Sequence, residues 1–268
     1  MSVLRSSARP LALVTGASSG IGAALARELA RDGHDLVLAA RRAAPLRALA
    51  EELEVHGATT TAISIDLSKA GAASDLAADV HARGLIVDTL VNAAGVGAHG
   101  RFDQADPVRV GEILQVNIVA LTELTRLLLP AMVARGRGRV MLVSSTAAFQ
   151  PGPQMAVYCA TKAYVLSFGE AIAFELRNSG VGVTTLCPGA TATEFAGVAD
   201  AGGSTLFKGS ASAVMSAEAV ARIGYRGLKA GRRVVIAGGL NRIMAIASRL
   251  SPPSLTLRIS NWMLSSAQ

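Results

Sequence analysis

A glycine-rich turn between a predicted strand and a predicted helix constrains this chain more than any other feature. Leu11–Val14 is an apolar run typical of a buried strand, and Ala23–Arg31 places Leu25 and Leu29 on one helical face. Between them stands Thr15-Gly16-Ala17-Ser18-Ser19-Gly20-Ile21-Gly22. Glycines in such a turn let backbone N–H groups approach a pyrophosphate at the positive end of the helix. This context predicts a dinucleotide site; the alternative is a glycine-rich turn without a ligand.

The rest of the chain alternates predicted strands with predicted helices. The strands are Leu11–Val14, Asp35–Ala40, Thr60–Ile65, Thr89–Val91, Arg139–Ser144, Gly182–Cys187 and Arg233–Ile236. The helices are Gly20–Arg31, Ala44–Val55, Ala72–Arg83, Pro107–Ala134, Met155–Asn178 and Ala217–Leu228. Such alternation indicates parallel β-α-β units with right-handed crossovers. We therefore expect an α/β fold with a Rossmann-type, doubly wound, seven-stranded parallel sheet in a single domain.

Tyr158 and Lys162 stand four residues apart in a predicted helix, so their side chains share one face. A free phenol has a pKa of about 10 and exchanges protons poorly near neutrality. A neighbouring ammonium favours the phenolate and lowers the pKa of the phenol. The spacing is common by chance, so its meaning depends on the other motifs of the chain.

Six elements, taken in order, resemble the short-chain dehydrogenase/reductase family. They are the Gly-x-x-x-Gly-x-Gly turn of residues 16–22, Asn92-Ala93-Ala94-Gly95, Asn117, Ser145 thirteen residues before Tyr158, the Tyr158/Lys162 pair, and Pro188-Gly189 followed by Thr191 and Thr193. The resemblance spans about Leu11 to Val235, and the tail resembles that of a bacterial subgroup near the DltE-type reductases. It implies the strand order 3-2-1-4-5-6-7. It also implies an oxidoreductase that transfers a hydride between NADP(H) and a carbonyl or secondary alcohol.

The resemblance implies a role for each matching residue. Tyr158 would be the acid in reduction and the base in oxidation, and Ser145 would bind the same substrate oxygen. Lys162 would bind the nicotinamide ribose and lower the pKa of Tyr158, and Asn117 would hold a water that links Lys162 to solvent. The cofactor-binding residues would be Gly16, Ser18, Ser19, Gly20, Ile21, Gly22, Asp66, Leu67, Asn92, Ala93, Ala94, Gly95, Tyr158, Lys162, Pro188, Gly189, Thr191 and Thr193. The alternatives are a helix N-cap for Asp66 and a surface position for Asn117.

The end of the second predicted strand indicates which cofactor is preferred. NAD-dependent enzymes usually place a carboxylate there for the ribose 2′-hydroxyl, whereas an arginine accommodates a 2′-phosphate. This strand ends Leu38-Ala39-Ala40-Arg41-Arg42. Because guanidinium groups suit phosphate, we expect NADP(H) rather than NAD(H), with Arg41 as the main contact and Arg42 as the second. The alternative is that both arginines are solvated at the start of a helix.

The segment between Gly189 and Ser216 has little periodicity and reads as a substrate loop, 189–216. Phe195, with Leu206 and Phe207, would cover the site, and Phe149 and Met155 would line the opposite wall. With Ser145, these side chains favour an apolar ketone, aldehyde or secondary alcohol. The alternative for each aromatic residue is ordinary core packing.

The last part of the chain, residues 239–268, reads as an amphipathic tail attached to a nucleotide-binding domain of residues 1–238. Ile243, Met244, Ile246, Ala247 and Leu250 make an apolar helical face, which Pro252-Pro253 interrupt. The tail contains three arginines and no acidic residue. We expect it to pack over the cleft or at a subunit interface, and contact with a membrane surface is the less favoured alternative.

Composition and charge narrow the partners and the compartment. The net charge is +7, but the basic residues are scattered and aromatic residues make up 4% of the chain, which argues against nucleic acid. No uninterrupted apolar run approaches the ~18 residues that cross a bilayer. Cys159 and Cys187 read as reduced core thiols of a cytoplasmic protein, and we expect no metal. The resemblance suggests a homodimer or homotetramer through the helices that carry Asn117 and Tyr158.

Two other function classes stay open. A catalytically silent NADP(H)-binding sensor or scaffold would keep the fold, but it would not need the relay of Ser145, Tyr158, Lys162 and Asn117. An epimerase or dehydratase of the longer related family would typically show Thr-Gly-x-x-Gly-x-x-Gly and a larger C-terminal domain, and this sequence has neither.

Overall fold

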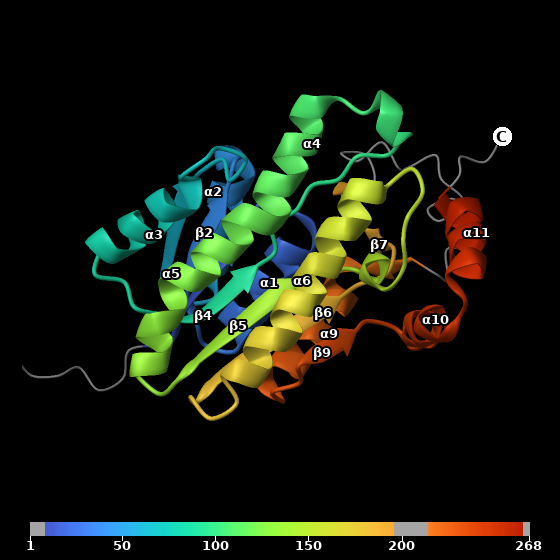
Figure 1. The fold of residues 1–268 in the computed structure, drawn as a ribbon. Helices are drawn as coiled ribbons and strands as arrows, with labels where there is room; N and C mark the ends of the chain where they lie inside the picture. Colours follow the sequence, from blue (N-terminus) through green and yellow to red (C-terminus); the bar gives the residue numbers. More distant parts are fainter. Residues whose placement is uncertain (1–8, 196–213, 265–268) are drawn as a thin grey trace, which may run out of the picture.

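The computed structural model describes residues 9–195 and 214–264 as a parallel sheet between two layers of helices (Figure 1). The strands of this sheet are β1 (Leu11–Thr15), β2 (Asp35–Ala40), β3 (Thr60–Ser64), β4 (Val87–Asn92), β5 (Gly138–Val143), β6 (Val181–Cys187) and β9 (Val234–Ile236). Neighbouring strands pair in parallel in the order β3-β2-β1-β4-β5-β6-β9. The expected seven-stranded α/β sheet is therefore confirmed.

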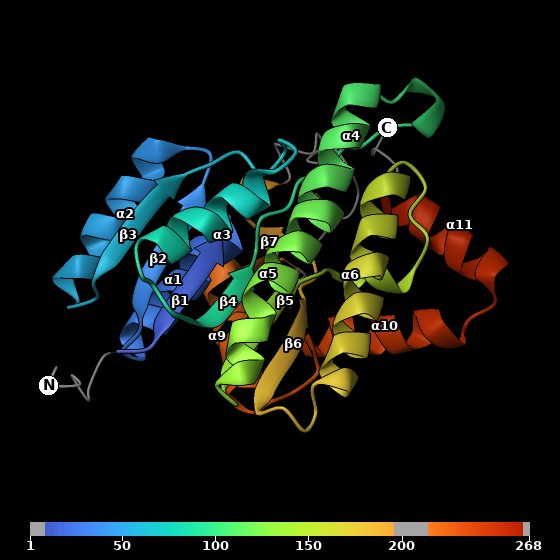
Figure 2. The same ribbon diagram turned by 60° about the vertical axis from the view of Figure 1, so that its left-hand side comes forward.

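Each face of the sheet buries a separate apolar core because helices cover both sides. One face carries α1 (Gly20–Arg31), α2 (Ala43–Val55) and α9 (Ala217–Lys229); the other carries α3 (Ala72–Ala82), α5 (Leu121–Ala134) and α6 (Ala156–Glu175) (Figures 1 and 2). Leu25 and Leu29 of α1 are fully buried in the first core, as their spacing on one helical face requires. Leu76 and Leu124 are fully buried in the second core.

The predicted helix Pro107–Ala134 contains a π-helical segment at its centre. It consists of α4 (Pro107–Leu114), the segment η2 (Gln115–Ala120) and α5. Its start is capped by Asp106, whose carboxylate accepts a hydrogen bond from Val108 N. A π-helical segment adds a residue to one turn of the helix, which changes the direction of the side chains that follow. Such segments often occur at functional sites. Here the π-helical segment carries Asn117, which is fully buried.

The same helix is long and apolar enough to cross a membrane by length and composition alone. Its most apolar 18-residue window has a mean hydropathy of 1.5, and 39% of that window is buried. Within the structure α5 packs against α3, β4 and β5. We therefore assign it as a core helix of the α/β domain.

The predicted substrate loop is not structureless at its two ends. Strands β7 (Thr191–Ala192) and β8 (Met215–Ser216) pair in parallel and close its base. Leu206 and Phe207 lie outside the described residues.

Two short 3-10 helices, η1 (Phe102–Gln104) and η3 (Thr146–Phe149), were not predicted from the sequence. Helix α6 ends at Glu175 rather than Asn178, because turns occupy the residues that lead to β6.

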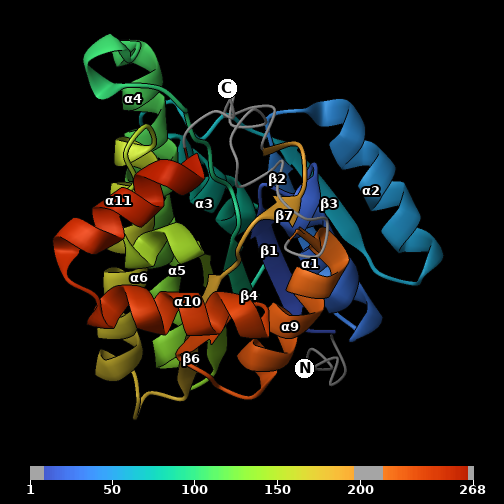
Figure 3. The same cartoon turned by 90° about the vertical axis from the view of Figure 1, so that its right-hand side faces the viewer.

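The tail forms two helices beyond β9. They are α10 (Gly239–Leu250) and α11 (Pro253–Leu264), separated at the predicted Pro252-Pro253 break. Proline has no N–H for the ladder, but it is tolerated in a first helical turn, so the break also starts α11. Figure 3 shows both helices on the side of the molecule that faces the viewer.

Candidate active site

A cavity of about 620 Å³ lies at the carboxyl ends of the central strands. Parallel α/β sheets place their ligands at this edge, where the strand order reverses. The predicted site residues that line it come from the glycine-rich turn, from the ends of β2 to β6 and from α6. Among the predicted site residues within 9–195 and 214–264, Asn92 and Asn117 are the two absent from its lining.

The glycine-rich turn is shaped by two left-handed residues and one close approach. Gly16 and Gly20 have φ of +68° and +54°, which side chains disfavour. A Cβ on Gly22 would meet the carbonyl oxygen of Gly16 well inside van der Waals contact. Thr15 Oγ1 accepts a hydrogen bond of 3.2 Å from Ala94 N, which holds the turn against the segment after β4. The turn therefore offers bare backbone at the start of α1, which fits a dinucleotide pyrophosphate.

Asn92 lies behind the cavity wall rather than in its lining, and its role in cofactor binding stays a prediction. It is 3% exposed, and its amide donates a hydrogen bond of 2.9 Å to Thr125 Oγ1. This bond joins the end of β4 to α5. Ala93, Ala94 and Gly95, which follow it, do line the cavity.

Asn117 also lies behind the cavity wall, where its side chain forms hydrogen bonds to two segments of that wall. Its Oδ1 accepts from Val96 N at 2.9 Å, and its Nδ2 donates to Val96 O at 2.9 Å and to Thr161 Oγ1 at 3.0 Å. The side chain therefore clamps the segment after β4 to α6. The surface alternative for Asn117 is wrong because the residue is fully buried. Its role in a water relay stays a prediction.

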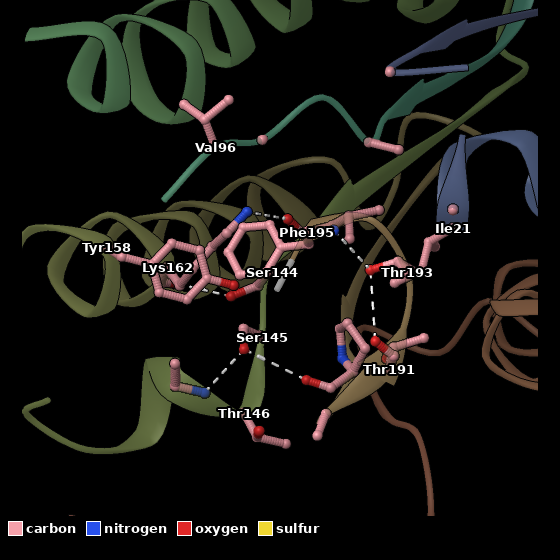
Figure 4. A pocket seen from close by; sticks show the side chains of 18 of the residues that line it. Ile21, Val96, Ser144, Ser145, Thr146, Tyr158, Lys162, Thr191, Thr193 and Phe195 are labelled. Carbon is pink, nitrogen blue, oxygen red and sulfur yellow. Dashed lines mark hydrogen bonds between the residues drawn. The ribbon is translucent and has the colours of Figure 1, made fainter. Parts of the chain in front are cut away.

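Ser145, Tyr158 and Lys162 converge on the cavity from the end of β5 and from α6 (Figure 4). Ser145 Oγ accepts a hydrogen bond of 3.1 Å from Ala147 N and donates one of 3.4 Å to Pro188 O. Lys162 Nζ donates to Val143 O at 3.0 Å and lies 5.7 Å from the centre of the Tyr158 ring. Ser144 Oγ instead donates to Lys162 O at 2.7 Å, away from Ser145 Oγ. Alternation along the strand thus separates the two serines, as expected.

Burial dominates the protonation of the Tyr158/Lys162 pair. It raises the pKa of Tyr158 above the usual range, although the Ser145 hydroxyl, as a hydrogen-bond partner, lowers it. It also lowers the pKa of Lys162 to about 8. At neutral pH the phenol therefore carries its proton and the amine is mostly charged. The ammonium of Lys162 donates to Val143 O, and the expectation that it lowers the pKa of Tyr158 stays a prediction.

The two arginines after β2 have different surroundings. Arg42 forms an ion pair of 2.6 Å with Glu194, which the sequence interpretation missed. Arg42, and then Ser19, hold the pKa of Glu194 below its usual range by hydrogen bonding. Arg41 is exposed, lines the cavity and forms no ion pair within the described part of the chain. Of the two guanidinium groups, Arg41 is therefore the one available to a ligand.

Asp66 both lines the cavity and caps a local turn. Its Oδ1 accepts hydrogen bonds from Ser68 N at 3.1 Å and Ser68 Oγ at 2.8 Å. Burial opposes its ionisation, but the bonds from Ser68 and the charge of Arg41 give a net lowering of its pKa. The carboxylate is thus kept charged beside the cavity, next to Leu67.

The end of the cavity beside Tyr158 is apolar. The rings of Phe195 and Tyr158 have centres 5.1 Å apart and are tilted by 43°. Met155, Cys159 and Leu264 form a buried cluster against them. Phe149 and Met155 line the same cavity.

Helices α10 and α11 contribute much of this wall, which the sequence interpretation did not assign to particular residues. The lining residues from these helices are Leu240, Asn241, Met244, Ala245, Ser248, Trp262 and Leu264. His99 Nε2 bonds to Leu264 O at 2.7 Å, and Ser248 Oγ donates to Phe149 O at 3.0 Å. The sequence showed the apolar periodicity of these two helices, but it did not show which face of each helix would point toward the cavity.

Comparison with known proteins places the chain in a family. Residues 10–202 match the family model of the short chain dehydrogenases. A short chain dehydrogenase of Pseudocercospora fijiensis is 35% identical over 71% of this chain, a match that spans 62% of the relative's own length.

Solved structures agree in fold over most of both chains. A short-chain dehydrogenase from Sphingobium yanoikuyae in complex with NADPH is 32% identical, with a TM-score of 0.80 over 89% of this chain and 92% of that one. A bulky-bulky ketone specific alcohol dehydrogenase from Comamonas testosteroni is 27% identical, with a TM-score of 0.76 over 90% and 92%. The sheet order, the glycine-rich turn and these matches lead to one conclusion: the chain belongs to the short chain dehydrogenase family.

Proposed function

We propose that this protein is an NADP(H)-dependent oxidoreductase that interconverts an apolar ketone or aldehyde and the corresponding alcohol. The observation that carries the proposal is the convergence of Ser145, Tyr158 and Lys162 on a cavity that also holds the glycine-rich turn. A bound hydride donor and the proton donor would then meet at one place, which such a reduction requires.

The chain's own residues supply the proton and the orientation. NADPH, when bound, would supply the hydride that reaches the carbonyl carbon. Tyr158 holds a proton at Oη at neutral pH, because burial raises the pKa of its phenol, and can give it to the oxygen that gains negative charge. Ser145 Oγ lies beside it and would hold that oxygen in place by a hydrogen bond. Charged Lys162 would bind the ribose and stabilise the phenolate left after proton transfer.

The preference for NADP(H) over NAD(H) is supported by Arg41. Its exposed guanidinium lines the cavity, and no carboxylate stands at the end of β2. Arg42 would contribute only after leaving its ion pair with Glu194. The relative from Sphingobium yanoikuyae was solved with NADPH, which agrees with this assignment.

An apolar substrate is supported by the wall around Tyr158. Met155 and Phe195 pack beside Tyr158, and Phe149 and Met244 line the same cavity. The bulky-bulky ketone specificity of the Comamonas testosteroni alcohol dehydrogenase fits a cavity of this kind.

We also propose that the protein assembles through α5 and α6 into a homodimer or homotetramer. Leu127 and Val133 of α5 and Phe174 of α6 are exposed on these helices. Large apolar side chains gathered on neighbouring helices favour a protein partner.

The test is NADPH oxidation and NADH oxidation by purified protein across a panel of ketones, aldehydes and quinones. Tyr158→Phe should lower kcat by at least about 100-fold while leaving the Kd for NADPH unchanged. Tyr164→Phe is the matched control, because Tyr164 lies on the same helix outside the cavity and its hydroxyl bonds to Thr122 Oγ1 at 3.0 Å. NADPH binding without any turnover over the whole panel would instead support the sensor or scaffold, which the dehydrogenase relatives do not favour.

A further inference from the structure

Helix α10 exposes its apolar side chains and turns small or polar residues toward the protein. Ala245 is 4% exposed, Asn241 Nδ2 donates to Ala237 O at 2.7 Å, and Ser248 Oγ donates to Phe149 O at 3.0 Å. The large apolar residues on the outside are Leu240, Ile243, Ile246 and Leu250, with exposures of 63%, 67%, 50% and 82%. A helix at the surface of a globular domain normally shows the opposite arrangement.

Helix α11 repeats this inverted arrangement. Thr256 and Ser260 are buried against the domain, and Ser260 Oγ donates to Pro151 O at 2.7 Å. The exposed residues include Leu255, Leu257, Ile259 and Trp262. Two successive helices are thus fixed to the domain by hydrogen bonds and present these large hydrophobic side chains outward, whereas Leu264 at the end of α11 is buried.

We call the outward residues of the two helices, taken together, the apolar tail face. It consists of Leu240, Ile243, Ile246, Leu250, Leu255, Leu257, Ile259 and Trp262. Figures 1 and 3 place α10 and α11 on the same outer side of the molecule. Apolar surface of this extent at a fold's exterior indicates a hydrophobic partner.

The charges on these helices indicate what kind of partner it is. Residues 239–264 contain Arg242, Arg249 and Arg258 and no Asp or Glu. Arg249 lies 3.8 Å from Glu170, whereas Arg242 and Arg258 are exposed and form no ion pair among the described residues. Cations beside large apolar side chains and a tryptophan are typical of helices that lie in the headgroup region of an anionic membrane.

We propose that the apolar tail face docks on an anionic phospholipid bilayer. A second copy of the chain fits this face less well, because a two-fold contact would bring the arginines of both copies into one apolar interface. Leu240 and Trp262 belong to the apolar tail face and also line the cavity. Docking would therefore set the mouth of the cavity at the membrane surface, where apolar substrates dissolve.

The chain contains one tryptophan, so its fluorescence reports on this face directly. Full-length protein is mixed with vesicles of phosphatidylcholine, alone or with phosphatidylglycerol. We expect co-sedimentation with the anionic vesicles, a blue shift of Trp262 emission and quenching by brominated acyl chains. Binding to neutral vesicles should be weaker, and salt should weaken binding to the anionic ones.

Variants separate the hydrophobic and the electrostatic parts. The double change Ile243→Ser and Leu250→Ser should lower the vesicle partition coefficient at least about tenfold. Arg242→Gln and Arg258→Gln should each lower it by about fivefold. Val55→Ser and Arg47→Gln are matched controls, because both residues are exposed on α2, far along the chain from the tail, and should leave it unchanged.

Two outcomes would overturn the proposal. One is unchanged sedimentation and emission with every vesicle. The other is a blue shift that depends on protein concentration without vesicles and disappears in the Ile243→Ser and Leu250→Ser variant, which would assign the face to a second copy. Both measurements are made without substrate, so they stand whether or not the reductase assay shows turnover.

Discussion

The two ends of the cavity differ in whether backbone or side chains determine their shape. The end near β1 depends on close backbone contacts, because Gly16 lies against the backbone of Ala94 and Gly22 against the carbonyl of Gly16. The end near Tyr158 consists of side chains from η3, α6 and the tail helices. A backbone surface has no freedom to change its shape, whereas a side-chain wall can be repacked. The glycine positions of the first end should therefore tolerate almost no substitution, whereas changes at the second end should alter specificity without loss of the fold.

Gly22→Ala is expected to have the largest effect. Its new Cβ would meet the Gly16 carbonyl, which is backbone and cannot rotate away. We expect a loss of unfolding free energy of about 1–3 kcal/mol or more, together with loss of NADPH binding. Urea unfolding and calorimetric titration measure the two effects.

Gly111→Ala in α4 is the matched control. A Cβ there meets no atom within 4 Å, and the residue lies inside a helix. Alanine is the better helix former, so the free energy of unfolding should rise by about 1 kcal/mol. Equal effects of the two substitutions would contradict the backbone account of the glycine-rich turn.

Lys162→Met tests how the buried ammonium between the two ends of the cavity affects the stability of the fold. The Lys162 pKa is lowered by burial from 10.5 to about 8, so below pH 8 the folded state carries a buried charge that it disfavours. A shift of this size corresponds to about 3 kcal/mol, from which the lost hydrogen bond to Val143 O subtracts about 1 kcal/mol. The cofactor-free variant should therefore be more stable at pH 7, by about 2 kcal/mol, while activity is lost.

The lowered pKa of Lys162 also determines whether the free energy of unfolding rises or falls with pH. Between pH 8 and 10.5 the unfolded lysine binds more protons than the folded one, so the stability of the natural protein rises with pH. The advantage of Lys162→Met should shrink over this range. Urea unfolding at pH 7 and pH 10 measures it, with exposed Lys69→Met as the control. A variant less stable than the natural protein at pH 7 would show that Lys162 supports the fold.

The first end of the cavity was open to prediction from the sequence because its chemistry depends on local backbone. Gly16, Gly20 and Gly22 have fixed spacing between a strand and a helix, and parallel strand ends meet at one edge. Asn92 and Asn117 show the limit of this reasoning. Their partners Thr125 and Thr161 are distant in sequence, so no local pattern tells whether an amide faces the cavity or clamps its wall.

The second end could not be predicted in the same way. The periodicity of residues 239–264 indicated helices, but not that Ala245 and Ser260 would face inward. That choice depends on tertiary hydrogen bonds, such as Ser260 Oγ to Pro151 O. The Arg42–Glu194 ion pair also joins residues far apart in the chain.

Arg41→Ala tests the cofactor preference proposed for the end of the cavity near β1. There a side chain, rather than the backbone, is proposed to distinguish NADPH from NADH. Removal of a charged hydrogen bond to a phosphate should raise the Kd for NADPH by about 10–100-fold. The Kd for NADH should change less than about twofold, because it lacks the phosphate. Calorimetric titration measures both, with Arg47→Ala as the control. Equal losses for the two cofactors would refute the assignment of Arg41.

Met244→Ala is expected to have the smallest effect and tests the second end. Met244 lines the cavity but is 41% exposed, so its truncation should leave the fold intact. Loss of apolar contact should lower kcat/KM for a bulky ketone by about tenfold and leave a small ketone nearly unaffected. The Kd for NADPH should stay constant. Ile243→Ala, one residue earlier and absent from the lining, is the control. If Met244→Ala weakened NADPH binding as much as ketone turnover, the two ends would not be separable.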